Sequence, residues 1–283
     1  LFDTAPSYED DYYPRDESLS PVGDGGWLRT SHGAYHLRTE NDGIVWSPRT
    51  TLDPLGSHFD LAVGSDGVGT AIAVVATDHS ASLMFARSTD GGTSWSELRT
   101  LSPLGPDGTR CRSCIPTHTA ITGTPDGSWI AAWSFDDDSG VARVVTVRSE
   151  DGGRSWARPR VIAVDLGVGN GGFDLETDGS GNWLLVWADR DLRISRSDTD
   201  GRTWTTPSTL VPEVACENCA AAARFNRVAA ANDAANVWVI VFSSSYFDRD
   251  TFGYDGDVFM LRSMDRGSSW SVPAPISDDA VTD

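Results

Sequence analysis

The sequence predicts an all-β fold built from five repeated four-stranded units. Three observations point to it: an eight-residue turn phrase that occurs five times, short apolar runs separated by Gly- and Asp-rich turns, and no pattern of a long amphipathic helix in the sequence. The tryptophans that end the five phrases are 49, 61, 48 and 66 residues apart. Such a period is typical of one supersecondary unit per repeat, stacked or arranged in a ring.

The turn phrase has its clearest copy at Ser88–Trp95, Ser-Thr-Asp-Gly-Gly-Thr-Ser-Trp. A short acidic or amide side chain at the third position can accept hydrogen bonds from backbone N–H groups, Gly at the fifth allows a positive φ, and the final Trp covers the turn. We therefore interpret the phrase as a hairpin lock, not as a functional site. The other copies are Thr39–Trp46, Ser149–Trp156, Ser197–Trp204 and Ser263–Trp270.

The chain divides into a connecting segment at 1–14, the repeated units at 15–276, and a tail at 277–283 that ends the last unit. In the first unit, strands are expected at Gly26–Arg29 and Ala34–Arg38. The second unit is the clearest, with strands predicted at Phe59–Val63, Thr70–Val75, Leu83–Arg87 and Glu97–Leu101. The last three units follow the same order, with strands predicted at Thr119–Thr122, Trp129–Trp133, Val141–Arg148, Pro159–Ile162, Phe173–Glu176, Trp183–Trp187, Leu192–Arg196, Pro207–Leu210, Phe225–Ala229, Val237–Phe242, Val258–Arg262 and Pro273–Ile276.

Composition sets limits on partners and compartment. The 41 acidic residues outnumber 22 basic residues, all of them Arg, and the formal charge of −19 argues against binding to nucleic acid or to anionic membranes. No apolar run reaches the roughly 18 residues of a membrane span. The chain starts at Leu1 and carries two Cys-x-x-Cys pairs, so we expect an extracellular or periplasmic protein and count further domains of a longer chain among its partners.

Several recurring residues are better explained as structural than as functional. Each third strand ends in an arginine, and five equivalent arginines indicate a repeated contact: Arg38, Arg87, Arg148, Arg196 and Arg262. The five turn tryptophans and those of the second strands are expected in the core. The second-strand tryptophans are Trp27, Trp129, Trp133, Trp183, Trp187 and Trp238.

The turn phrase resembles the Asp-box, or BNR repeat, of sialidase-like β-propellers, and the resemblance runs from about Glu17 to Ile276. It implies a five-bladed β-propeller of four-stranded antiparallel blades, with five blades of a six-bladed ring as the alternative. It also implies a functional face opposite the Asp-boxes, made by the connections from strand four to the next strand one and from strand two to strand three. Where sialidases carry an Arg-Ile-Pro signature this chain has Cys114-Ile115-Pro116, which lacks the catalytic arginine.

Polar residues near that face are the candidates for chemistry. A glycosidase would draw its acid and base from the carboxylates there, and sequence cannot give their separation. The carboxylate candidates are Asp60, Asp174, Asp189 and Asp191. Arginines on the face could bind an anionic ligand through paired hydrogen bonds. The ligand-binding candidates are Arg15, Arg110, Arg112, Arg190, Arg224, Asn226, His58 and His118.

Histidines and clustered aspartates are the candidates for a metal. His58 and His118 each precede an Asp-Gly turn by eight residues, which places them alike at the start of strand one, and His32 and His79 fall in the connections from strand two to strand three. Zn²⁺, Cu²⁺ or acid–base chemistry near neutral pH would suit them. A cluster of four aspartates could bind Ca²⁺ or simply be solvated. Its members are Asp248, Asp250, Asp255 and Asp257.

The four cysteines form two pairs in equivalent connections between units, Cys111 with Cys114 and Cys216 with Cys219. Two disulfides, local or crossed, would hold these long connections, and a four-thiolate Zn²⁺ site is the alternative. Taken together, the sequence predicts an exported propeller that binds a carbohydrate or another small ligand. The alternatives are a glycan-active hydrolase or lyase and a metal-dependent site on the histidine-rich face.

Overall fold

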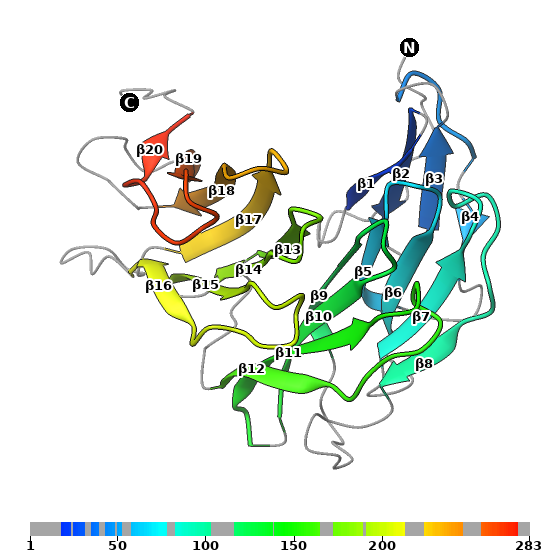
Figure 1. The fold of residues 1–283 in the computed structure, drawn as a ribbon, viewed down its shortest axis with the longest axis horizontal. Helices are drawn as coiled ribbons and strands as arrows, with labels where there is room; N and C mark the ends of the chain where they lie inside the picture. Colours follow the sequence, from blue (N-terminus) through cyan, green and yellow to red (C-terminus); the bar gives the residue numbers. More distant parts are fainter. Residues whose placement is uncertain are drawn as a thin grey trace.

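The computed structural model describes residues 18–23, 25–31, 35–39, 43–48, 50–52, 58–77, 83–102, 116–137, 139–164, 172–188, 191–212, 224–245 and 256–276. These residues form five antiparallel sheets of four strands, each with its strands in chain order. The predicted five four-stranded blades are therefore confirmed, and they are arranged as a five-bladed β-propeller (Figure 1). Among the described residues there is no helix long and apolar enough to cross a membrane.

The strands of the first three blades are β1 Leu19–Gly23, β2 Gly26–Ser31, β3 Tyr35–Thr39, β4 Thr50–Thr51, β5 His58–Ser65, β6 Ala71–Thr77, β7 Leu83–Ser88, β8 Arg99–Ser102, β9 Pro116–Gly123, β10 Trp129–Asp136, β11 Ala142–Ser149 and β12 Arg160–Val164. Those of the last two are β13 Phe173–Thr177, β14 Trp183–Ala188, β15 Leu192–Ser197, β16 Ser208–Val211, β17 Arg224–Asn232, β18 Trp238–Ser245, β19 Gly256–Ser263 and β20 Ala274–Pro275. The predicted strands agree with these apart from their ends, where most inner strands run one to three residues further.

The core lies between the faces of successive blades. The innermost strands pack in sequence, β1 on β5, β5 on β9, β9 on β13 and β13 on β17. Trp129 of β10, for example, shares a buried cluster with Ile72 and Val74 of the preceding blade. Four of the second-strand tryptophans are among the largest fully buried side chains, and Trp133 is buried as well, which confirms their predicted place in the core. Those four are Trp129, Trp183, Trp187 and Trp238.

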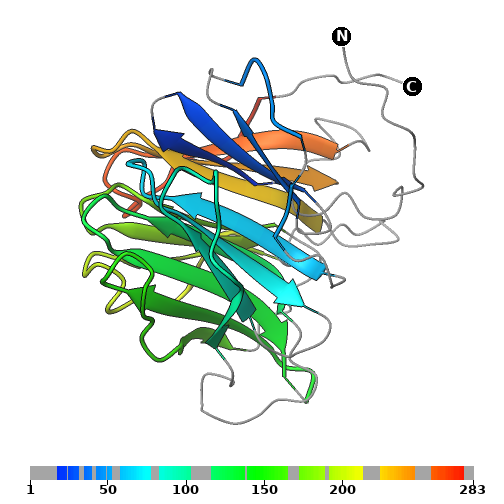
Figure 2. The ribbon, with the colours of Figure 1, turned by 90° about the vertical axis from the view of Figure 1, so that its right-hand side faces the viewer.

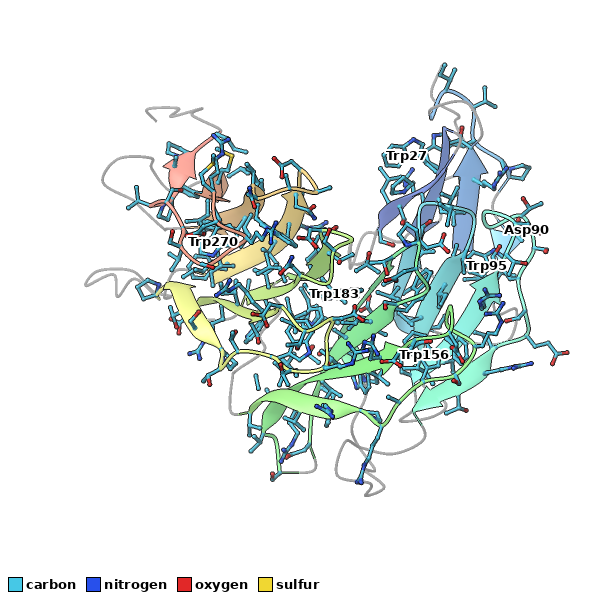
Figure 3. The ribbon with its side chains drawn as sticks, in the orientation of Figure 1. Trp27, Asp90, Trp95, Trp156, Trp183 and Trp270 are labelled. Carbon is cyan, nitrogen blue, oxygen red and sulfur yellow. The ribbon has the colours of Figure 1, made fainter. Side chains whose placement is uncertain are left out.

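In Figure 1 the ribbons of the first and fifth blades are separated by an opening that no other blade spans. Trp27 occupies the strand position of Trp129 and Trp183, as shown by the pairing of each with the first residue of its blade's turn phrase. Trp27 is nevertheless only half-buried and lies beside that opening in Figure 3. On the fifth blade, Val239 and Val241 are also half-buried. No described residue covers these two end faces as completely as the blades cover one another.

The turn phrase forms the predicted lock. In the second blade, the carboxylate of Asp90 accepts hydrogen bonds from the backbone N–H of Ser94 at 2.9 Å and from its hydroxyl at 2.5 Å. The Ser88 hydroxyl accepts from the N–H of Gly92 at 2.8 Å, and Gly92 has a φ of +84°. The indole N–H of Trp95 donates to the Gly92 carbonyl at 3.2 Å (Figure 3). Every one of these bonds joins residues that are three or four positions apart.

Arg38 and Arg87 bond across blades, which agrees with the structural role predicted for the third-strand arginines. Arg38 donates through Nε to the carbonyl of Gly91, at 2.8 Å, and Arg87 does the same to Gly152, at 2.5 Å. Each arginine therefore crosses to the Asp-box of the next blade. Within a blade, Gly91 of the box also donates to Gly69 in the turn between the first two strands, so both turns lie at the same end, on the left in Figure 2.

Candidate functional site

Three of the five inner strands carry a bulge near the end that the connections from the preceding blade reach. The pairing of β5, β9 and β17 skips one residue there, Phe59, Thr117 and Asn226 respectively. Directly after the bulge, Asp60, His118 and Arg227 occupy one register position, since each pairs with the sixth residue of its blade's second strand. β-Bulges often re-aim side chains beside functional sites. An acid, an imidazole and a guanidinium thus share one register level, on the inner strands of the second, third and fifth blades.

The register changes one sequence-based expectation. His58 and His118 are not placed alike: His118 is level with Asp60, whereas His58 lies earlier on its strand. The reason is the turn that follows each strand. Asp66 closes the turn of the second blade by donating from its N–H to Thr70, but Thr124 takes that place in the third blade. The Asp-Gly pair of the third blade therefore comes two residues later in its turn.

Asp60 and His118 differ in their surroundings. Asp60 is buried, and its Oδ1 accepts a hydrogen bond from the N–H of Leu61 at 2.9 Å. His118 is half-buried, and its Nδ1 lies 3.3 Å from the hydroxyl of Ser134. The same hydroxyl lies 3.0 Å from that of Thr117, the bulged residue. Ser134 therefore contacts both the imidazole ring and the bulged residue.

Asp174 is bound on both carboxylate oxygens. Oδ1 accepts from the N–H of Leu175 at 2.8 Å, and Oδ2 accepts from the N–H of Ala230 on the next blade at 2.7 Å. Burial raises the pKa of Asp174 to about 6, although these two bonds act in the opposite direction. The first blade has the same arrangement, with the hydroxyl of Ser18 accepting from the N–H of Val63 at 3.1 Å. Asp174 therefore joins two blades, a role that sequence reasoning did not assign to it.

Glu176 is a titratable residue that the sequence analysis missed. It lies two residues after Asp174, and side chains at this spacing in a strand lie on the same face. Burial, and then the charge of Asp174, raises the pKa of Glu176 to about 8. Near neutral pH this carboxyl group is therefore largely protonated and can donate a hydrogen bond. The alternation of β13 was the signal that could have revealed the pair.

Asp191 lies before β15 and forms an ion pair with Arg193, at 2.7 Å from Oδ2 to the guanidinium. The other predicted residues divide into two groups. His58, Arg224, Asn226 and Asp257 lie in described strands, but only their backbone is described. The rest lie outside the described residues: Arg15, His32, His79, Arg110, Cys111, Arg112, Cys114, Asp189, Arg190, Cys216, Cys219, Asp248, Asp250 and Asp255.

The metal and disulfide hypotheses rest almost wholly on that last group. Within the described ranges, no cluster of three or more His, Cys, Asp or Glu side chains could hold a metal ion. Zn²⁺, Cu²⁺ and Ca²⁺ therefore stay predictions, as do the cysteine pairings. Asp60, His118 and Arg227 share one register level on the inner strands of the second, third and fifth blades, and Asp174 and Glu176 are neighbours on the inner strand of the fourth.

Comparison with known proteins agrees with the fold. A family model described as "BNR repeat-like domain" matches residues 22–217. A search of curated proteins gave no match. Among solved structures, the chain is similar to the BP39L lectin from Burkholderia pseudomallei, with 17% identity, a TM-score of 0.62, and coverage of 92% of this chain and 70% of the lectin.

Two solved enzymes are similar as well. The Hadza microbial sialidase Hz136 has 19% identity and a TM-score of 0.58 over 93% of this chain, which spans 58% of the sialidase's length. The GH93 α-L-arabinofuranosidase of Fusarium graminearum, solved with arabinobiose, has 15% identity and a TM-score of 0.51, with coverage of 77% and 65%. At such identities these likenesses establish the fold alone.

Proposed function

The chain belongs to the BNR repeat-like domain family, and from that premise we propose that it is an exported carbohydrate-binding β-propeller. The observation that carries the proposal is the shared level of Asp60, His118 and Arg227. Asp60 offers hydrogen-bond acceptors, the imidazole of His118 can donate or accept, and the guanidinium group of Arg227 is a cationic donor. Sugar hydroxyls both donate and accept, so a mixed ring of this kind suits them better than it suits an apolar ligand.

The similar structures support a carbohydrate. One is a lectin, one is a sialidase, and one is an arabinofuranosidase in complex with arabinobiose. Binding is favoured over hydrolysis because two of the predicted catalytic carboxylates have structural bonds. Asp174 uses both oxygens on backbone N–H groups, and Asp191 is paired with Arg193.

Export is supported by the paired cysteines. Measuring the intact mass before and after alkylation without reductant tests whether these cysteines are oxidised.

Glycan-array binding followed by calorimetry tests the proposal. We expect one class of oligosaccharide to bind the wild type, and Asp60→Asn and His118→Ala to weaken that binding by about tenfold each, as the removal of one hydrogen bond to the sugar would. Asp198→Asn is the matched control, because Asp198 is exposed and belongs to the Asp-box of the fourth blade. Wild-type affinity in both channel variants, with unchanged melting temperatures, would reject this site.

A glycoside hydrolase is the second candidate, with Glu176 as its general acid and Asp174 in the structural role given above. Burial raises the pKa of Glu176, and a carboxyl group kept protonated near neutral pH can act as the general acid in hydrolysis of a glycosidic bond. Release of reducing ends from a panel of oligosaccharides, lost in Glu176→Gln and kept in Asp198→Asn, would support it. Absence of turnover across the panel, from pH 4 to pH 9, would exclude hydrolysis of those substrates.

A further inference from the structure

Two pockets of the same construction lie between successive blades at the Asp-box end. The first, of about 510 Å³, lies between the second and third blades, and the second, of about 490 Å³, lies between the third and fourth. They are neighbours, because the Asp-box of the third blade supplies Arg154 to the first and Trp156 to the second. Figure 3 shows Trp95 and Trp156 on these adjoining blades.

Each pocket is built from the same four positions of the repeat. These are the arginine that ends strand three, the Asp-box tryptophan, the residue four positions after that tryptophan, and the residue after the fifth-position glycine of the next blade's box. In the first pocket they are Arg87, Trp95, Arg99 and Arg154. In the second they are Arg148, Trp156, Arg160 and Arg202.

The arginines at the last two positions are not required by the fold. At the boundary between the first two blades the same positions hold Thr50 and Thr93, and between the last two blades they hold Ser208 and Ser268. The blades pack there with hydroxyl side chains in place of guanidinium groups. The four extra arginines are therefore confined to the two adjoining pockets, and two of them, Arg160 and Arg202, also bond across the boundary between the third and fourth blades.

Few carboxylates neutralise these arginines. Of the described residues that line the first pocket, three are arginines and none is acidic. The guanidinium group of the exposed Arg99 has no hydrogen-bond or ion-pair partner among the described residues, while that of Arg154 donates to the Asp151 carbonyl, at 2.7 Å. Burial, and then the charge of Arg154, lowers the pKa of Arg87, although the charges of Asp66 and Asp151 act in the opposite direction. An anion between these groups would relieve that repulsion.

The second pocket has four arginines against two acidic residues. Arg148 is occupied by Glu150 and Asp200, and Arg202 also reaches Glu150, at 2.9 Å. Arg160 donates to the Arg202 carbonyl at 2.7 Å, and the exposed Arg158 has no described partner. The guanidinium groups of Arg158 and Arg160 are thus the two in this pocket that no described carboxylate pairs with. Such cationic lining is unusual on a chain with a formal charge of −19.

We propose that the two pockets together bind an acidic oligosaccharide, with one carboxylate or sulfate group in each. Guanidinium groups bind such oxyanions through paired hydrogen bonds, and the half-buried rings of Trp95 and Trp156 offer an apolar face on which a sugar can stack. Two equivalent pockets on adjoining blades match a polymer whose charges recur. This site lies at the opposite end of the blades from Asp60 and His118 and does not depend on the channel binding a sugar.

The test uses the residues that the molecule itself places at the equivalent boundaries. Arg99→Thr with Arg154→Thr converts the first pocket, and Arg160→Ser with Arg202→Ser converts the second. Calorimetry would use a heparin hexasaccharide, which has sulfates and carboxylates, and a polygalacturonate hexasaccharide, which has carboxylates only. Maltohexaose is the neutral probe. Arg143→Ser with Arg262→Ser is the control that removes two arginines outside both pockets.

We expect wild-type binding to at least one acidic probe and none to maltohexaose, with affinity falling as salt rises. Each pocket variant should bind about tenfold or more weakly, the variant with all four changes should not bind detectably, and the control should bind as wild type. Binding that survives the four changes would overturn the proposal. Absence of binding to both acidic oligosaccharides would also overturn it. Equal affinity for hexaglutamate or a DNA hexamer would overturn it too, because the pockets would then bind polyanions that are not acidic oligosaccharides. Asp60→Asn should leave the result unchanged.

Discussion

The carboxylate of Asp174 accepts a hydrogen bond of 2.7 Å from the backbone N–H of Ala230 and so connects the inner strands of the fourth and fifth blades. Ala230 is buried, so water cannot replace the carboxylate as the hydrogen-bond acceptor of its N–H if that carboxylate is removed. The bond replaces, between blades, the ladder hydrogen bond that the edge of an inner strand lacks.

Removing this acceptor should destabilise the protein. Asp174→Ala leaves the Ala230 N–H buried without a partner, and we expect a loss of about 2 kcal/mol in the free energy of unfolding, measured by urea denaturation. Asp174→Asn keeps an oxygen acceptor and should cost less. Ser18→Ala, which removes the same bond to Val63, should cost about 1 kcal/mol. Equal stability of Asp174→Ala and wild type would show that the bond contributes nothing net.

Stability should fall as pH rises through the neutral range. The pKa of Glu176 rises from 4.5 in the unfolded chain to about 8 in the folded one, so between these values the folded state binds more protons. The stabilisation is complete below about pH 4.5 and is lost as pH rises through 8. We expect the melting temperature to decrease from pH 5 to pH 8 and Glu176→Gln to flatten that decrease. An identical slope in Glu176→Gln would assign the pH dependence elsewhere.

The Asp-box aspartates should control the acid side of the stability profile. Burial disfavours ionisation of Asp90, but the hydrogen bonds from Ser94 and Ser88 outweigh it and lower its pKa to about 2. The corresponding stabilisation is present above about pH 4 and is lost as pH falls through 2. Asp90→Ala should lower the melting temperature at pH 7 and weaken its dependence on pH below 4.

Asp90→Thr is the informative partner to that variant. The fourth blade carries Thr199 at this position, and its hydroxyl accepts from the N–H of Thr203 at 2.9 Å. Threonine can therefore replace the neutral part of the lock. We expect Asp90→Thr to recover much of the stability lost in Asp90→Ala at pH 7, without the dependence on acid pH. Equal melting temperatures for the two variants would mean that the charge alone matters.

A glycine on the inner strand of the second blade sets how closely two blades approach. A Cβ atom on Gly64 would lie 2.3 Å from the carbonyl oxygen of Ile121, so Gly64→Ala forces the two backbones apart. We expect a loss of about 2 kcal/mol or more by urea denaturation, in the range of overpacked cores. Gly140→Ala is the control, because it has a positive φ but open space around it, and should cost about 1 kcal/mol. The reverse order of the two would contradict the close approach.

The blades could be predicted because the Asp-box is local. Its hydrogen bonds join residues within four positions, so the eight residues of the phrase determine the structure of the turn almost by themselves. The candidate site was harder to predict, because the register level shared by Asp60, His118 and Arg227 depends on β-bulges that residue spacing does not reveal. The arginine pockets could not be predicted, because each forms only where the Asp-boxes of two neighbouring blades meet. The arginines that distinguish these two blade boundaries from the others also lie at positions that vary from one repeat to the next.

The same locality has a consequence for how the chain folds. A turn whose bonds span three or four residues has almost no loop to close, so its entropic cost is small and each box can form before any blade contacts another. The arginines that end the third strands then act across that formed turn, as Arg87 does on Gly152. We therefore expect assembly to proceed by docking of pre-formed hairpins, which several boxes can nucleate independently, and not to depend on one central nucleus.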